Sequence, residues 1–301
     1  MEGWLLFNQP ESGLTETDYT PPRLVQAATQ KNIPLKIYGS HELDLLVTHA
    51  DERSIVANNS RVTLPDFIIP GVGASVSYFG LALIRQLEQL GVYVCNGSAA
   101  ISMARDKLQM IQMLSHHHLP TPKTMLVKFP MSMKRIASEI GFPLVLKMVS
   151  GTEGFGVHLC ETKHALQEIM EIISSQIHQS PMIVQEFIKS SYGRDLRVFV
   201  LGGKAIACMQ RTSTRGFKAN FSLGGTVASY PITPEIEHLA CATAELFGLE
   251  IAGIDLLFDG SSFKVCEANS APELKGIELA SQLDIATQII EHVQQVVLAK
   301  R

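Results

Sequence analysis

Residues 251–270 read IAGIDLLFDGSSFKVCEANS and carry the clearest fold signal in the chain. Two mostly apolar runs, residues 251–258 and 263–268, flank the short polar segment Asp-Gly-Ser-Ser. Apolar runs of this length, separated by a turn that contains glycine, are typical of two antiparallel strands joined as a hairpin. The sequence therefore predicts a β-hairpin here.

The same hairpin brings acidic side chains together. If Asp259 pairs with Phe263 across the turn, Asp255 stands opposite Glu267 and the two carboxylates share a face. Asn269, two residues further along, points to the same side. Two carboxylates and an amide oxygen form a site for a hard cation such as Mg²⁺. The alternative is a pair of edge-strand charges in water. The apolar neighbours of Asp255 favour the metal site, because burying an unpartnered carboxylate is costly.

The first third of the chain alternates strands with helices. We expect short apolar strands at residues 4–7, 35–38, 66–69 and 91–95, and helices at 22–31 and 76–90. This alternation predicts a mostly parallel sheet covered by helices. No Gly-x-Gly-x-x-Gly follows the first strand, which argues against a dinucleotide-binding domain.

The remainder reads as α+β with antiparallel sheets. The expected strands are residues 124–128, 143–148, 157–160, 181–187, 195–201, 204–210, 251–258 and 263–268, and the expected helices are 99–115, 131–140, 163–175, 234–247 and 276–299. We therefore predict three parts: an N-terminal α/β domain (1–95), a central subdomain with a glycine-rich loop (96–185) and a C-terminal subdomain (186–301).

Composition and charge exclude several classes of protein. The 301 residues are 46% hydrophobic and 18% charged, which is too apolar for a disordered chain, and the net charge of −4 argues against a general nucleic-acid or membrane-surface binder. Five cysteines without a Cys-x-x-Cys spacing indicate reduced thiols in a cytoplasmic protein. The uncharged stretch 67–84 approaches transmembrane length, but a proline and several glycines interrupt it, so we expect a strand, a loop and a helix.

A lysine and a glycine-rich loop form a candidate phosphate site. Lys147 precedes residues 150–156, SGTEGFG, whose glycines let backbone N–H groups approach an anion closely. The segment is not a Walker A loop, because no Gly-Lys-Ser/Thr follows and the next element is a strand. A purely structural turn is the alternative.

Two more polar segments extend this candidate site. The strand that ends at Glu186 and Phe187 offers backbone groups to a purine edge, and a nearby acid can accept hydrogen bonds from ribose hydroxyls. The alternative is a surface salt-bridge network with residues 194–197. Residues 211–225 are rich in basic side chains and glycine, which suits either a phosphate-contacting loop or a solvated one.

Taken in order, these segments resemble the ATP-grasp superfamily and, within it, the RimK-type (ribosomal-protein glutamate ligase-like) carboxylate–amine ligases. The resemblance extends from Leu5 to about Ile290. The matching segments are PGVGAS (70–75), ARDKL (104–108), PLVLK (143–147), GTEGFGV (151–157), VQEFIK (184–189), DLR (195–197), GG (224–225), AGID (252–255) and EANSAPELKGIE (267–278).

The resemblance implies an ATP-grasp fold, with an N-terminal pre-ATP-grasp domain and two α+β subdomains that clamp ATP. It implies ATP-binding roles for Lys107, Lys147, Gly151, Thr152, Gly154, Gly156, Gln185, Glu186, Phe187, Asp195, Lys218, Ala219 and Asn220. Catalytic roles fall to Arg211, which would face the acyl-phosphate, and to Lys147. Asp255, Glu267 and Asn269 would bind Mg²⁺, with Mn²⁺ as an alternative ion.

The implied reaction joins a carboxylate to an amine at the expense of ATP. It would add an amino acid to a peptide, a protein C-terminus or a small molecule. The expected enzyme is a cytoplasmic homo-oligomer, a dimer or tetramer, that binds neither nucleic acid nor membrane. Two other readings stay open: a regulatory nucleotide-binding protein of the same fold without ligase turnover, and a kinase that stops at phosphoryl transfer.

Three arginine positions of the family pattern are changed in this chain, and Ala219 replaces a family serine. Gly71 and Leu223 stand where the family has arginine, and Lys218 replaces a third arginine. An arginine fork binds a carboxylate at two points. We therefore expect an amino acid or peptide less acidic or more apolar than free glutamate as the preferred substrate. Alternatively, the family arginines contact only ATP phosphates or a protein tail.

Overall fold

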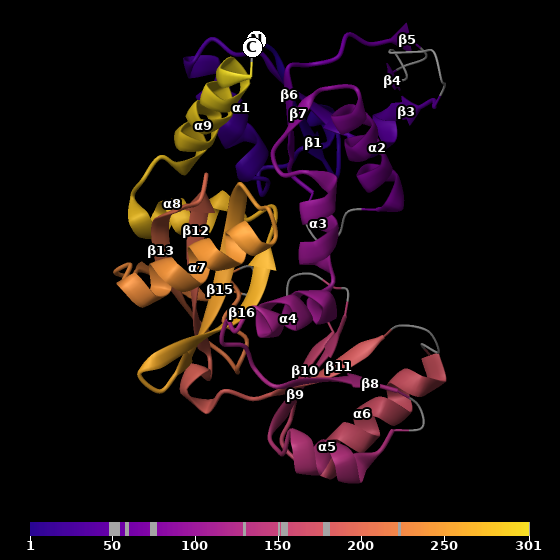
Figure 1. Ribbon diagram of the computed structural model, residues 1–301, viewed down its shortest axis with the longest axis vertical. Coiled ribbons are helices and arrows are strands. Elements are labelled where there is room, and N and C mark those ends of the chain that lie inside the picture. The colour runs from indigo at the N-terminus through magenta and orange to yellow at the C-terminus, as the bar shows by residue number, and fades with distance from the viewer. Residues whose placement is uncertain are drawn as a thin grey trace.

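The computed structural model describes residues 1–47, 55–57, 60–72, 77–128, 131–149, 151, 156–176, 181–221 and 224–300. Figure 1 shows a parallel sheet at one end of the molecule, and a four-stranded sheet with helices α5 (Met133–Glu139) and α6 (Lys163–Gln176) at the other. A five-stranded sheet lies between them. The predicted combination of α/β and α+β architecture is confirmed. Within these ranges, no helix has both the length and the apolar character needed to cross a membrane.

The N-terminal sheet is parallel, as predicted. Its strand order is β2 (Leu35–Gly39), β1 (Gly3–Phe7), β6 (Phe67–Pro70) and β7 (Tyr93–Val94). Helix α1 (Thr20–Gln30) has prolines in its first turn, where the missing N–H costs nothing, and Ser77 caps α2 (Tyr78–Gln89). The sequence did not predict a small antiparallel sheet of β3 (Leu43–Leu45), β4 (Ile55–Ala57) and β5 (Ser60–Arg61).

The sheet at the other end of the molecule, called the four-stranded sheet below, is antiparallel. Its strand order is β10 (Val157–Cys160), β9 (Leu144–Met148), β11 (Met182–Glu186) and β8 (Thr124–Val127). Leu144 and Leu146 of β9 pack in an apolar cluster with Ile136 of α5 and Leu166 of α6. Because successive strand residues face opposite sides, Lys147 points away from this core.

The five-stranded sheet is the centre of the molecule. Its order is β14 (Thr226–Ser229), β13 (Lys204–Thr212), β12 (Arg194–Leu201), β15 (Ile251–Asp259) and β16 (Ser262–Asn269). One apolar cluster joins it to α3 (Ser98–Arg105), α4 (Lys107–His116) and α7 (Pro234–Leu246), and a second joins it to α8 (Leu274–Ser281), α9 (Ile285–Ala299) and the N-terminal sheet. Short 3₁₀ turns cover Glu11–Gly13, Ser40–Glu42 and Lys189–Ser191. Apolar packing therefore crosses both predicted domain boundaries, which themselves stay a prediction.

Two of the predicted helices are each two helices. The predicted helix 99–115 breaks at Asp106, whose backbone is extended and whose Oδ1 accepts hydrogen bonds from the N–H groups of Leu108 and Gln109. The predicted helix 276–299 breaks at Gln282, which has a left-handed backbone (φ 59°). In the first case the acidic side chain competes with helical hydrogen bonding and starts a new helix.

The predicted register of the hairpin is wrong at the turn and right at the acidic pair. Asp259 pairs with Ser262, not Phe263, so the turn is one residue tighter than predicted. A β-bulge then adds one residue, Cys266, to β16. The bulge restores the expected pairing of Asp255 with Glu267.

One buried amide joins the N-terminal sheet to this hairpin. Asn96, which follows β7 and is 2% exposed, donates through Nδ2 to the carbonyls of Ile251 and Ser270, both at 2.7 Å. Its Oδ1 accepts from the N–H groups of Glu250 (2.7 Å) and Ile251 (3.0 Å). A single side chain thus fixes the start of β15 relative to the end of β16.

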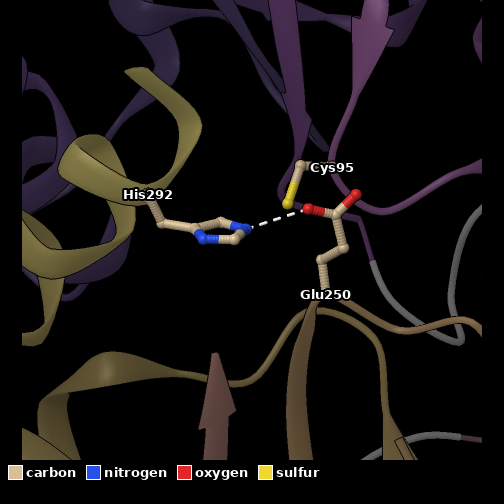
Figure 2. Close-up of side chains that lie close together, drawn as sticks. All are labelled: Cys95, Glu250 and His292. Carbon is tan, nitrogen blue, oxygen red and sulfur yellow. Dashed lines mark hydrogen bonds and ion pairs between the residues drawn. The ribbon is translucent and has the colours of Figure 1, made fainter. Parts of the chain in front are cut away.

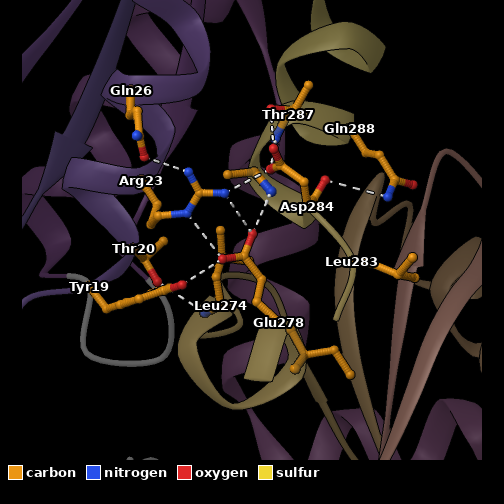
Figure 3. A network of polar contacts seen from close by, with 12 residues as sticks. Tyr19, Thr20, Arg23, Gln26, Leu274, Glu278, Leu283, Asp284, Thr287 and Gln288 are labelled. Carbon is orange, nitrogen blue, oxygen red and sulfur yellow. Dashed lines mark hydrogen bonds and ion pairs between the residues drawn. The ribbon is translucent and has the colours of Figure 1, made fainter. Parts of the chain in front are cut away.

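A second polar contact joins α1 to α8. The buried carboxylate of Glu278 accepts hydrogen bonds from Tyr19 Oη (2.7 Å) and Arg23 Nε (3.1 Å), and Arg23 also pairs with Asp284 at 2.8 Å (Figure 3). Burial of the Tyr19 ring, together with its hydrogen bond to Glu278, raises the pKa of that phenol. This network holds the N-terminal part against the helix that follows the hairpin.

We expect Asn96→Ala to lower the free energy of unfolding by about 2–4 kcal/mol. The substitution leaves buried backbone donors and acceptors, which the amide now satisfies, without hydrogen-bond partners. Chemical denaturation measures the loss. Gln109→Ala is the control, since that amide is exposed on α4, and a change of no more than about 0.5 kcal/mol is expected there. Equal losses in both variants would contradict a structural role for Asn96.

Candidate active site

A cleft of about 930 Å³ opens between the four-stranded and five-stranded sheets. Fourteen residues predicted as site residues line it: Lys107, Lys147, Gly151, Gln185, Glu186, Phe187, Asp195, Arg211, Lys218, Ala219, Asn220, Asp255, Glu267 and Asn269. Gly156 is described but is not part of the lining, and Thr152 and Gly154 lie outside the described residues. Positions up to 162 apart in the sequence thus converge on one cavity.

A ladder of alternating charges crosses the floor of the cleft. The carboxylate of Asp255 on β15 accepts two hydrogen bonds from Arg197 on β12, at 2.7 and 2.8 Å, and lies 2.9 Å from Arg211 on β13. Asp195 accepts two more from Arg211, both at 2.7 Å. The register explains the ladder, because it places Arg197 opposite Asp255 and Asp195 opposite Arg211 on adjacent strands.

Burial and pairing act against each other in this ladder. Burial raises the pKa of Asp255, but the guanidinium groups of Arg197 and Arg211 outweigh it and hold that pKa below its usual range. At Asp195 burial dominates and raises the pKa, although Arg211 offsets part of the shift. The contribution of Asp255 to stability is therefore present above its unfolded-state pKa and is lost as the pH falls through the lower folded-state value.

The three predicted metal ligands lie on one wall. Glu267 Oε1 is 3.1 Å from the Nζ of Lys107, which also donates to the Gly151 carbonyl at 2.7 Å. Asn269 Nδ2 donates to the Gly253 carbonyl at 3.1 Å and lies 3.5 Å from Asp255 Oδ2. Both carboxylates are paired with cationic side chains, Glu267 with Lys107 and Asp255 with two arginines. Their oxygen atoms are the donor type that fits a hard divalent ion.

The opposite wall comes from β9 and β11. Lys147 Nζ donates to Gln185 Oε1 at 2.7 Å and lies 3.6 Å from the sulfur of Cys266, the bulge residue. Gln185 in turn donates to Thr124 Oγ1 at 2.9 Å, which fixes the orientation of its amide. The lysine is therefore held at the boundary between the two sheets.

At the end of β11, the wall changes from charged to aromatic. Glu186 lies 3.2 Å from Lys264 Nζ and accepts from the Lys123 N–H at 3.1 Å. The Phe187 ring packs edge-on against Tyr192, with the centroids 6.2 Å apart. Burial lowers the pKa of Lys218, which also lines the cleft.

Sequence reasoning assigned no role to Arg197, although it lines the cleft and donates two hydrogen bonds to Asp255. The segment Asp195-Leu196-Arg197 does contain a signal for it. Residues two apart on a strand share a face, so Arg197 lies on the same face as Asp195. The partner strand could not be identified from the sequence, because Asp255 is 58 residues away.

Comparison with known proteins identifies the family of this chain. The RimK-like ATP-grasp domain matches residues 104–293, and the RimK PreATP-grasp domain matches residues 14–101. The chain belongs to the RimK-like ATP-grasp family. It is 36% identical over 285 residues to a probable alpha-L-glutamate ligase of Aliivibrio fischeri, covering 94% of each chain. As a member of this family, it is an ATP-dependent carboxylate–amine ligase, as the resemblance implied.

Solved structures show the same fold. A RimK domain ATP-grasp protein from Sphaerobacter thermophilus superposes with a TM-score of 0.75 at 19% identity, covering 97% of this chain and 99% of that one. The ATP-grasp ligase PsnB, in complex with a minimal precursor, Mg and ADP, gives a TM-score of 0.72 at 17% identity, covering 99% and 98%. The predicted ATP-grasp architecture is confirmed.

We expect Arg197→Ala to lower the free energy of unfolding by about 3–5 kcal/mol, because it leaves a buried carboxylate with one guanidinium in place of two. Denaturant titration near neutral pH measures this. Arg194→Ala is the matched control, since that arginine lies on the same strand but is exposed, and a loss of about 1 kcal/mol or less is expected. A small loss for Arg197→Ala would mean that Arg211 alone can neutralise Asp255.

Proposed function

We propose that this ligase phosphorylates a carboxylate with ATP in the cleft and then couples the acyl-phosphate to an amine. The observation that carries the proposal is the meeting of Lys107 and Lys147 with the Asp255–Glu267 wall, with buried Arg211 beside them. A carboxylate cannot expel an oxide ion, so its oxygen must first become part of a phosphate leaving group. Attack by the amine then releases phosphate.

Each wall has a distinct role in this reaction. Lys107 and Lys147 place positive charge where the ATP phosphates would lie, and Glu186 and Phe187 would border the adenine. Asp255, Glu267 and Asn269 would hold Mg²⁺, or Mn²⁺ in its place. When bound, such an ion neutralises phosphate charge.

Arg211 would stabilise the reacting acyl-phosphate. The two hydrogen bonds that Arg211 donates to Asp195, and its contact with Asp255, fix the guanidinium plane before substrates bind. A donor that is already oriented needs no reorganisation as charge develops on the phosphoryl oxygens. In the structure Asp195 faces Arg211, so a ribose contact by this carboxylate would be additional to that pair.

For the amino-acid substrate, we propose a side chain less acidic than that of glutamate. The relative's name makes L-glutamate the first comparison, but this chain has glycine at position 71, which lines the cleft. A Cβ there would lie 3.2 Å from Phe7 Cδ2 and 3.3 Å from Leu5 Cδ1, so an arginine would fit only if these side chains moved. Leu223, the second missing arginine, lies outside the described residues.

The acceptor we propose is the amine of a peptide, a protein C-terminus or a small molecule, in a cytoplasmic enzyme. All five cysteines are free thiols, three of them buried, which suits a reducing compartment. We also propose a homo-oligomer, because Leu279 in α8 and Leu283, just after this helix, remain 57% and 42% exposed. Light scattering would show a dimer or tetramer; a monomer would contradict this.

Phosphate release, combined with mass spectrometry of the products, tests the reaction. We expect ATP turnover to require both an acid and an amine, to yield an amide, and to fall at least a hundred-fold in Glu267→Gln because a charged oxygen ligand is lost. Glu245→Gln, an exposed acid on α7, should retain full activity. A phosphorylated product without an amide would indicate a kinase, and no turnover with any pair would favour a regulatory nucleotide-binding protein.

The ratio of kcat/KM for glutamine to that for glutamate tests the substrate proposal. Loss of one charge-assisted hydrogen bond, worth about 1.5–3 kcal/mol, weakens an acidic substrate by about ten-fold or more. We therefore expect neutral amino acids to give the higher kcat/KM. A clear preference for glutamate would mean that the absent arginines do not contact the amino acid.

A further inference from the structure

Outside the cleft, three side chains converge where the N-terminal sheet meets the five-stranded sheet. Cys95 follows β7, Glu250 precedes β15 and His292 lies in α9, and Figure 2 shows their polar ends turned toward one another. One ligand atom from each lies within 4.8 Å of the others. Across the part of the chain that the structure describes, no other group of three His, Cys, Asp or Glu side chains is arranged to share an ion.

We propose that Cys95, Glu250 and His292 bind a Zn²⁺-type transition-metal ion. A thiolate, an imidazole and a carboxylate are the donors that zinc takes in proteins, at about 2.0–2.3 Å each. Ligand atoms within 4.8 Å of one another can reach that shell with small rotamer changes. Mg²⁺ would not compete, since sulfur and nitrogen donors suit it poorly.

The geometry leaves one coordination position open to solvent. Cys95 is 1% exposed, whereas the side chains of His292 and Glu250 are 21% and 37% exposed. The thiol therefore forms the closed end of the site and the other two donors form its mouth. An ion could enter from that side and keep water as its fourth ligand.

Neighbouring groups hold Glu250 and His292 in place. The Glu250 N–H donates to Asn96 Oδ1 at 2.7 Å, and the Glu250 carbonyl accepts from Gly202 N–H at 2.8 Å. His292 packs directly over Gly202, where a Cβ would come within 2.7 Å of the ring. Tyr93 donates to Glu250 Oε2 at 2.5 Å, the kind of outer contact that orients a ligating carboxylate.

Charge and protons balance on binding. Without metal, His292 Nε2 lies 2.9 Å from Glu250 Oε2, and burial together with that carboxylate raises the pKa of Cys95, which is therefore a thiol. Binding releases the thiol proton to solvent, and neutral His292 coordinates through Nε2 with its remaining proton on Nδ1. The positive charge of Lys300, whose Nζ lies 4.4 Å from the Tyr93 ring centroid, disfavours the binding of a cation nearby. The side chain is exposed, however, and solvent screens its charge.

Isothermal titration of the full chain with Zn²⁺, in excess Mg²⁺ to occupy the cleft, tests the site. We expect one equivalent bound, with a rise in melting temperature. Cys95→Ser and His292→Gln should each weaken binding by about a hundred-fold or more, and Tyr93→Phe by about ten-fold, as for an outer contact. Cys241→Ser, a half-buried cysteine on α7, should bind normally.

Cobalt(II) gives a readout that does not depend on any variant folding. In the wild-type protein, Co²⁺ bound at this site should show the near-ultraviolet absorption of a sulfur-to-cobalt charge transfer, and Zn²⁺ should abolish it. Absence of that band, or unchanged zinc affinity in Cys95→Ser, would overturn the proposal. The cluster would then be only a hydrogen-bonded joint between the two sheets.

Discussion

The side-chain amide of Asn96 fixes the N-terminal sheet relative to the five-stranded sheet. Its four hydrogen bonds use both amide protons and both lone pairs of the oxygen, and all of them end on backbone groups at the start of β15 or just after β16. These two strands carry the acidic wall of the cleft. A buried amide with every group satisfied tolerates little displacement, because any shift breaks several bonds together. The N-terminal sheet therefore sets the position of strands that belong to another part of the fold.

The charged ladder shows a different way of building a rigid surface. Asp195, Arg197, Arg211 and Asp255 alternate in sign across three strands, so each buried charge has an opposite charge on its neighbour. Apolar residues of similar volume would pack here at lower cost, since burying ion pairs is expensive. The ion pairs lie at the cleft that we propose as the site of phosphoryl transfer, a reaction that benefits from fixed dipoles and charges.

The sequence predicted local features well and long-range partners poorly. Alternating strands and helices gave the parallel sheet, and the DGSS turn gave the hairpin, because both signals lie within a few residues. The breaks at Asp106 and Gln282 were missed, since both lie inside apolar patterns that continue on either side. The contacts of Arg197, and the approach of Cys95 to residues more than 150 positions later, depend on strand order, which periodicity does not encode.

The bulge at Cys266 changes which residues of β16 face the apolar core. Phe263 and Val265 are buried in the apolar core, whereas Glu267 and Asn269, also odd-numbered, line the cleft. In a regular strand all four would face the same side, and the carboxylate would point into the core. One inserted residue thus reverses the alternation part-way along the strand. A single β-strand therefore contributes to the hydrophobic interior near its turn and to the lining of the cleft at its other end.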